Sequence, residues 1–304
     1  MLKFFDKLRS LFNKKEPEKP ALDNIVTAPL SDAQLQSIKA LSAHRYEPMQ
    51  LIATSAQSVG RQRELNEDSL FCLSTTIAGN TSNPPFGLYI IADGMGGHQY
   101  GEIASNTAIR VIAGYVLKKF HDSLFSLTGT PVEESLQEIL QAATSEAQKA
   151  VLHEAPGSGT TVTAALIVGQ QLTIAHVGDS RAYLIYNDQR MEAITRDHSL
   201  VRRLEELGQI TAAEAAVHPQ RNVLYRALGQ GETLESDITT TPFPVGGYLL
   251  ICTDGLWGVV SDNELRRILN EGPTMQRACQ NMIAAANAAG GPDNISAVLV
   301  QLLG

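Results

Sequence analysis

The chain has 304 residues, of which 43% are hydrophobic and 18% are charged, a composition typical of a soluble globular protein. Its net charge of −8 argues against a nucleic-acid-binding protein, and no apolar run reaches the roughly 18 residues that a membrane-spanning helix needs. The three cysteines, Cys72, Cys252 and Cys279, are widely spaced, so free thiols in a reducing compartment are expected. The N-terminus does not resemble a signal peptide. We therefore expect a cytoplasmic protein.

Residues 1–20 differ in charge from the rest of the chain. They carry six Lys or Arg and three Asp or Glu, so the remaining 284 residues carry a net −11. Within residues 1–15, Phe4, Leu8 and Leu11 recur at helical spacing among lysines, and the prolines of "EPEKP" end the helix. This basic amphipathic segment is predicted to contact either an anionic membrane surface at its cytoplasmic face or a partner's groove; the alternatives are packing onto the rest of the chain or disorder.

Residues 21–52 show weak periodicity and are interpreted as a connecting arm, with one possible helix at residues 31–43. From residue 53 onward the patterns are clearer. Helices are predicted at residues 101–120, 131–155, 261–272 and 274–290, and residues 195–229 are also predicted to be helical and polar. Strand-like apolar runs occupy residues 86–93, 160–168, 171–177, 181–186, 248–253 and 295–300.

The order of these segments indicates the fold class. Consecutive long helices and strands joined by the short turns "GQ" and "GDS" do not fit a parallel array in which strand and helix alternate. We predict an α+β fold of antiparallel sheets packed face to face, with helices outside. The run 160–186 is predicted to be an antiparallel meander, which places Asp179 in a hairpin turn.

Three acids stand where an apolar strand begins or ends. Asp93-Gly94 and Asp254-Gly255 each follow a strand, and Asp293 lies in a glycine-proline turn just before the last one. Any one of them alone is most simply an ordinary turn, because Asp-Gly is a common turn dipeptide. Three together predict that the strand ends meet and that a hard divalent cation, Mg²⁺ or Mn²⁺, offsets their repulsion.

Eight motifs in order resemble the metal-dependent serine/threonine protein phosphatases, the PPM or protein phosphatase 2C family, in its bacterial form. They are "RELNEDS", "ADGMGGH", "SGTT", "HVGDSRAYL", "TRDHSL", "NVLYRALG", "CTDGLWGVVSD" and "GGPDNISAVLV". The resemblance covers residues 53–304, expected to form the phosphatase domain. It implies a four-layer αββα sandwich, with two antiparallel sheets flanked by helix pairs and a metal cleft at one edge.

The resemblance also implies roles for individual residues. Asp93 would bridge two metal ions, Asp254 and Asp293 would hold the first, and the Gly94 carbonyl would serve the second. Asp179, with Asp254, would hold a weaker third ion, and Arg63 would bind the substrate phosphate. Glu67 and Asp68 fall where the family places carboxylates that hydrogen-bond water molecules on the metals, and Asn294 completes the usual "DN" pair with Asp293.

The implied activity is hydrolysis of phosphoserine or phosphothreonine in proteins by a water molecule held between two cations. Such an enzyme would reverse a bacterial Ser/Thr kinase and is expected to be monomeric. A small-molecule phosphatase and a non-catalytic pseudophosphatase are the alternatives. Eukaryotic members carry a histidine where this chain has Met95, so the leaving-group acid is open; His98 is interpreted as a loop residue. Residues 195–226 are expected to form a flap over the cleft.

Overall fold

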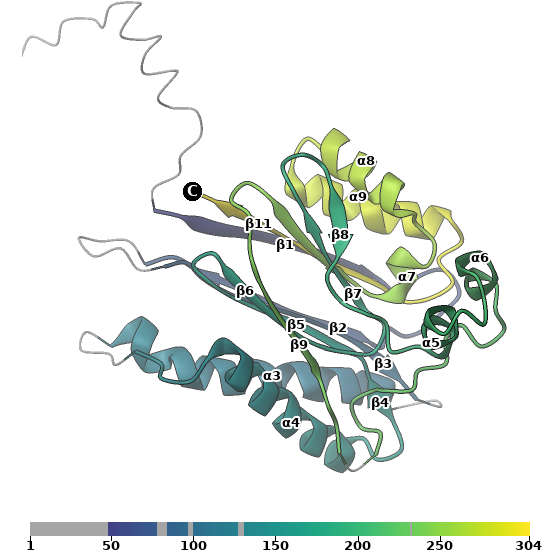
Figure 1. Ribbon diagram of the computed structural model, residues 1–304, viewed down its shortest axis with the longest axis horizontal. Coiled ribbons are helices and arrows are strands. Elements are labelled where there is room, and N and C mark those ends of the chain that lie inside the picture. Colours follow the sequence, from purple (N-terminus) through teal and green to yellow (C-terminus); the bar gives the residue numbers. More distant parts are fainter. Residues whose placement is uncertain (1–47, 78–83, 97–99, 127–130, 232) are drawn as a thin grey trace, which may run out of the picture. The chain divides into compact units, whose positions relative to one another are not determined.

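Two antiparallel sheets lie face to face, and helices cover both outer surfaces (Figure 1). The computed structural model describes residues 48–77, 84–96, 100–126, 131–231 and 233–304. The expectations for the N-terminal segment, for the helix at 31–43 and for His98 concern residues outside these ranges. Because Gln50 already pairs with Leu303, residues 50–52, assigned above to the connecting arm, instead belong to the first strand.

The first sheet contains both ends of the described chain. Its order is β1 (Gln50–Ser58), β11 (Ile295–Leu303), β10 (Tyr248–Cys252), β7 (Arg181–Ile185) and β8 (Met191–Ala193). The second sheet has the order β2 (Asp68–Thr75), β3 (Phe86–Met95), β5 (Val162–Val168), β6 (Gln171–Val177) and β9 (Asp237–Pro242), with the short β4 (Gly159–Thr160) pairing to the end of β3.

The helices form the two outer layers of the predicted αββα sandwich, which is thereby confirmed (Figure 1). The second sheet is covered by α3 (Gly101–Phe125) and α4 (Leu136–Glu154), and the first by α8 (Asp262–Glu271) and α9 (Met275–Ala288). Three short helices lie in connections: α5 (Leu200–Glu206), α6 (Ala212–Ala216) and α7 (Asp254–Trp257). No helix of the described part is long and apolar enough to cross a membrane.

Strand β3 shows how the sequence builds three apolar layers. Leu88 and Ile90 pack against α3 and α4, whereas Tyr89 and Ile91 point into the space between the sheets. Successive side chains of a strand alternate between its faces, so a strand covered on both sides must be apolar at every position. Burying each of these large side chains stabilises the fold by roughly 1.5–3 kcal/mol.

Helix starts follow local capping chemistry. The Ser261 hydroxyl accepts a hydrogen bond from the backbone N–H of Glu264, which confirms the predicted start of α8. Helix α4 begins later than the expected residue 131, because Ser135 and Glu138 form a reciprocal capping box there.

The predicted meander over residues 160–186 is wrong in its second half. Strands β5 and β6 do pair as a hairpin, but β6 belongs to the second sheet and β7 to the first. The chain changes sheets at Gly178, whose φ of +107° is a conformation that favours glycine. Asp179 therefore lies in a crossover between the two sheets rather than in a hairpin turn.

Candidate active site

The acids singled out in the sequence meet at one edge of the sandwich. Asp68 begins β2 and is paired in register with Asp93 near the end of β3. Asp254 follows β10 as the first residue of α7, and Asp293 lies in the turn before β11. Each of these residues, together with Asp179 of the crossover, acts electrostatically on Asp93. The fold thus gathers five carboxylates from five separate segments.

Gly94 allows three segments beside this cluster to come into contact. Its backbone N–H donates to the Glu67 carbonyl at 3.1 Å. A Cβ at this position would lie 2.1 Å from the Gly101 carbonyl oxygen and 2.7 Å from that of Glu67. Only glycine fits there, so the end of β3, the loop before β2 and the start of α3 are held at van der Waals distance.

Hydroxyl groups hold Asp68 and Asp93 in place. Oδ2 of Asp68 accepts hydrogen bonds from Ser296 Oγ at 2.6 Å and from Thr253 Oγ1 at 3.0 Å. The backbone N–H of Asp93 donates to Thr161 Oγ1 at 2.9 Å. None of these three hydroxyl residues was predicted as a site residue; the position of Thr253 immediately before Asp254 was the available signal.

Two carboxylate oxygens in this cluster are buried without a hydrogen-bond partner among the described residues, namely Oδ1 of Asp68 and Oδ1 of Asp254. A buried oxygen of this kind carries a desolvation cost that normally requires a donor or a cation. A hard cation fits this donor set, because all the side-chain donors here are oxygens.

The pKa values of four acids in the cluster are raised. Burial, followed by the repulsion of neighbouring carboxylates, raises the pKa of Asp254 to about 6. The pKa of Asp68 is raised to about 7, again mainly by burial, against its hydrogen bonds to Ser296 and Thr253. Burial and neighbouring acids raise the pKa values of Asp93 and Asp179 well above the ordinary range. Deprotonating this cluster without a cation is therefore costly.

Arg63 contacts the cluster through Asp293. One of its terminal nitrogens, NH2, lies 2.8 Å from Asp293 Oδ2, and nearly half of the arginine side chain, 48%, is exposed. Burial would lower the pKa of Arg63, but Asp293, Glu67 and Asp93 raise it above the usual arginine value. Arg63 is thus a charged group at the open side of the cleft.

Asn294 fixes the loop that carries Arg63. Its side-chain oxygen accepts from the Glu67 backbone N–H at 2.8 Å, and its Nδ2 donates to the carbonyls of Val59 and Leu65, both at 2.8 Å. The hydrogen bonds of its side chain are therefore all made to backbone groups. Glu67 is half-buried beside Gly101, and burial raises its pKa.

A complete set of ligands is not preassembled. Among the described residues, no group of three or more acidic, histidine or cysteine side chains is arranged so that it could hold a metal ion. Asp293 is instead engaged with Arg63. The individual ligand roles of Asp93, Gly94, Asp254, Asp293 and Asp179 stay predictions.

Residues 195–226, predicted above to form a flap and called the flap below, carry α5 and α6 and are attached to the Asp179 crossover. The backbone N–H of His198 donates to the Gly178 carbonyl at 2.7 Å, and the Gly178 N–H donates back to His198 Nδ1 at 3.1 Å. Since Nδ1 is an acceptor, the ring proton lies on Nε2, which donates to Asp237 at 3.1 Å. Burial is the main cause that lowers the pKa of His198.

A second attachment of the flap uses a buried ion pair. Arg181 binds Asp197 through two nitrogens, with an NH2–Oδ2 distance of 2.7 Å, and its guanidinium stacks 3.5 Å from the centre of the Trp257 ring. The indole N–H of Trp257 donates to the Asp179 carbonyl at 3.0 Å. Asp197, His198 and Trp257 thus surround Asp179, although the sequence analysis gave the first two no role beyond their motif, "TRDHSL".

Comparisons with known proteins agree with this architecture. The sequence model of the family Protein phosphatase 2C matches residues 52–295. A serine/threonine phosphatase, stp, from Listeria innocua is 37% identical over 244 residues, which cover 80% of this chain and 92% of that protein.

Solved structures give the same result. The serine/threonine phosphatase PstP/Ppp of Mycobacterium tuberculosis has a TM-score of 0.70 and 32% identity, covering 84% of this chain and 100% of that one. A structure of the PstP catalytic domain in complex with two manganese ions has a TM-score of 0.68 and 31% identity, with 84% and 100% coverage. The chain therefore belongs to the protein phosphatase 2C family, the metal-dependent serine/threonine protein phosphatases, in its bacterial form.

Proposed function

We propose that this phosphatase hydrolyses phosphoserine and phosphothreonine in proteins with two divalent ions at Asp93, Gly94, Asp254 and Asp293, and that Asp179 takes part in a weaker third site. When bound, the ions activate the attacking water and neutralise charge on the phosphoryl oxygens. The observation that carries this proposal is the pair of buried, unpartnered oxygens on Asp68 and Asp254.

Arg63 is proposed to bind the substrate phosphate. Its guanidinium can offer two parallel N–H groups to two phosphate oxygens, a geometry that a lysine cannot reproduce. In the structure its partner is Asp293. Because Asp293 is both a proposed metal ligand and the partner of Arg63, metal binding and phosphate binding would be coupled at this residue.

The scaffold residues keep this cleft in shape. Asn294 holds the Arg63 loop on strand β11, while Thr253 and Ser296 orient Asp68. Asp68 and Glu67 are proposed to accept hydrogen bonds from water molecules around the cations. These residues position other groups and do not transfer a proton to the substrate.

The test measures phosphate release from a phosphothreonine peptide and from p-nitrophenyl phosphate with Mn²⁺, with Mg²⁺ and with EDTA. We expect release from both substrates that EDTA abolishes and added metal restores. Isothermal titration calorimetry should show about two strong metal sites, and the Asp254→Asn variant should bind metal more weakly. Release that persists in EDTA, or tight metal binding that is unchanged in that variant, would contradict the proposal.

The biological role proposed here is to oppose a Ser/Thr kinase, because an enzyme that removes phosphate from proteins needs a kinase to supply its substrates. The contact of residues 1–15 with a membrane or a partner, and the monomeric state, stay predictions. Vesicle co-sedimentation of the full chain against a chain starting at Ala21 tests the membrane contact.

A further inference from the structure

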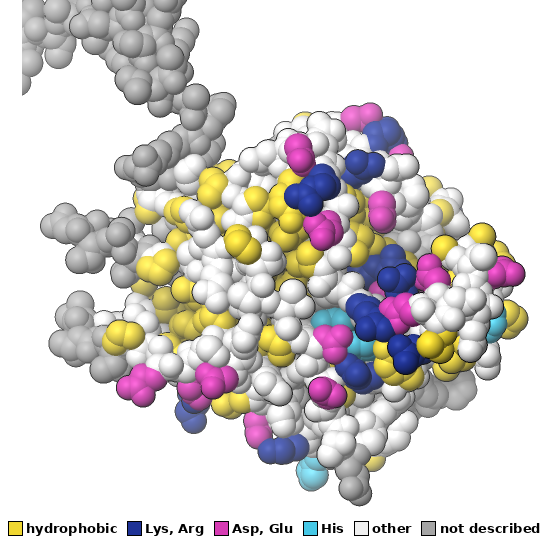
Figure 2. All heavy atoms as spheres, viewed as in Figure 1, with side chains coloured by type: hydrophobic (Ala, Val, Ile, Leu, Met, Phe, Trp, Pro, Cys, Tyr) yellow, Lys and Arg dark blue, Asp and Glu magenta, His cyan; other side chains and the backbone are white. Residues whose placement is uncertain are grey.

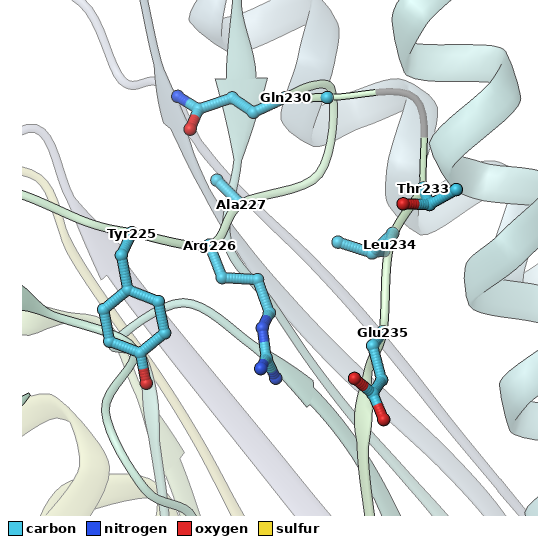
Figure 3. A pocket seen from close by; sticks show the side chains of 8 residues that line it. Tyr225, Arg226, Ala227, Gln230, Thr233, Leu234 and Glu235 are labelled. Carbon is cyan, nitrogen blue, oxygen red and sulfur yellow. The ribbon is translucent and has the colours of Figure 1, made fainter.

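A cavity of about 600 Å³ opens beside the flap, between residues 225–231 and residues 233–235. Figure 3 shows Arg226 between the ring of Tyr225 and the carboxylate of Glu235, with Gln230, Thr233 and Leu234 along the rim. Polar and apolar groups both line it. Its volume lies within the range of ordinary ligand pockets, about 300–1,000 Å³.

Both walls of this pocket are fixed to α4. The buried Gln148 donates to the carbonyls of Gln230 and Gly231, at 3.3 Å and 2.9 Å, and accepts from the Gly229 N–H at 2.7 Å. On the other wall, the hydroxyls of Thr144 and Ser236 are 3.1 Å apart. The pocket is therefore preformed, which keeps the entropy cost of binding low.

The pocket lies within reach of a peptide bound in the metal cleft. Leu228 exchanges two hydrogen bonds of 2.9 Å with Thr160, and Thr160 is paired with Gly94. Neighbouring strands are about 4.8 Å apart, so Leu228 lies about 10 Å from Gly94. Gln230 also contacts Met95, two residues after Asp93, with an Nε2–Sδ distance of 3.8 Å. An extended peptide covers about 10 Å in three residues.

The charges of the pocket leave one acid free. Arg226 is neutralised by Asp237, with an NH1–Oδ1 distance of 2.7 Å, and Asp237 also accepts from His198. Glu235 is exposed and, within the described residues, has no ion pair or hydrogen bond. Tyr225 is 48% exposed; the Arg226 guanidinium carbon already lies 5.9 Å from the centre of its ring, so the exposed part of Tyr225 offers mainly apolar contact. The unmatched charge of the pocket is therefore negative.

We propose that this pocket is a substrate subsite that binds a lysine or arginine side chain three to six residues from the phosphorylated residue. Glu235 receives the cation, and Tyr225 packs against its aliphatic stem. The inference rests on the proposed function, because the cleft must hold the phosphorylated residue for the pocket to select its neighbour.

The test is a set of phosphothreonine peptides with lysine, alanine or glutamate at each position three to six residues on either side. At one of these positions, lysine should raise kcat/KM about fivefold over alanine, mainly through KM, as expected for a partly exposed ion pair. The Glu235→Lys variant should reverse the order, so that the glutamate peptide becomes the better substrate.

Glu133→Lys is the matched control. Glu133 is also exposed, but it precedes α4, whose first residue, Leu136, is 12 residues and hence about 18 Å from Gln148 along the helix axis. This variant should keep the lysine preference. Hydrolysis of p-nitrophenyl phosphate, which is too small to reach the pocket, should be equal in all three proteins.

Two results would overturn the inference alone: wild type hydrolysing the lysine, alanine and glutamate peptides equally at every position, or Glu235→Lys retaining the wild-type order. A wild-type enzyme that hydrolyses neither the peptides nor p-nitrophenyl phosphate would overturn the proposed function, and the subsite with it.

Discussion

The carboxylates of the metal cleft and those of the flap have opposite surroundings. In the cleft, Asp68 and Asp179 are each 6% exposed and Asp254 keeps a buried oxygen without a partner. On the flap, Glu205 and Glu206 lie near the surface among arginines, with ion pairs to Arg202, Arg203 and Arg196. Figure 2 shows such basic and acidic side chains together over the region of α5.

This difference separates two uses of acidic residues. Exposed pairs exchange water contacts for contacts with arginine at little net gain. Buried acids without a counter-charge destabilise the fold, and they are retained where a cation is to be bound. The flap acids form ion pairs near the surface. In the cleft, a bound cation would relieve the repulsion between the buried carboxylates, and this relief would add to the free energy of metal binding.

The largest effect should come from Asp254→Asn. We expect phosphothreonine hydrolysis to fall about 1,000-fold, which corresponds to about 4 kcal/mol of transition-state stabilisation. The same change should raise the free energy of unfolding of the metal-free protein, because it removes a charge whose pKa is raised to about 6 by burial. Steady-state kinetics and urea denaturation in EDTA measure the two effects. A loss of metal-free stability would contradict the contrast between the two regions.

Asp197→Ala tests the buried pair at the base of the flap. Removing the acid leaves Arg181, 27% exposed, without its charged partner, so we expect the free energy of unfolding to fall by about 3 kcal/mol. Urea denaturation with metal bound is the measurement. The double variant Arg181→Met, Asp197→Leu should recover part of this loss, whereas no recovery would argue against an uncompensated charge as the cause.

The pH dependence of the metal-free protein should be opposite to that of a protein stabilised by ion pairs. The pKa values of Asp68 and Asp254 are raised to about 7 and 6, so between pH 4 and pH 7 the folded state binds more protons than the unfolded state. The free energy of unfolding in EDTA should therefore fall by several kcal/mol as the pH rises through this window. With saturating Mn²⁺ this fall should disappear, since metal binding displaces those protons. If the free energy of unfolding in EDTA rose with pH instead, the raised pKa values of Asp68 and Asp254 would be contradicted.

The smallest effect is expected on the flap surface. Glu205→Ala breaks a pair with Arg202 in which the side chains are 29% and 44% exposed, so the free energy of unfolding should change by less than about 0.5 kcal/mol. The change should shrink further in 0.5 M salt. A loss above 1 kcal/mol would show that the two regions differ less than the structure indicates.

Much of the sandwich was predictable because its strands are buried on both faces and its helices have clear periodicity. The run 86–93 could hardly be anything but a central strand. The convergence of Asp93, Asp254 and Asp293 was also predictable, because each adjoins such a strand. These positions follow from apolar patterns that extend over many residues.

The predictions that were wrong or missing concern single turns and loops. The "GDS" turn after β6 is compatible with a hairpin or with a change of sheet, and only the partners of β7 decide between them. The pocket around Glu235 was missed because the sequence around it has no periodicity. Its walls, residues 230–231 and 233–235, are held by Gln148 and Thr144 of α4. Contacts between residues so far apart in sequence leave no local pattern.

The single tryptophan of the chain has a practical consequence. Its indole is hydrogen-bonded to the Asp179 backbone and covered by the Arg181 guanidinium. Intrinsic fluorescence excited at this one chromophore therefore originates next to the crossover, with no background from other indoles. Emission changes on adding cations or phosphopeptide would report this corner of the enzyme directly, without a dye or an engineered probe.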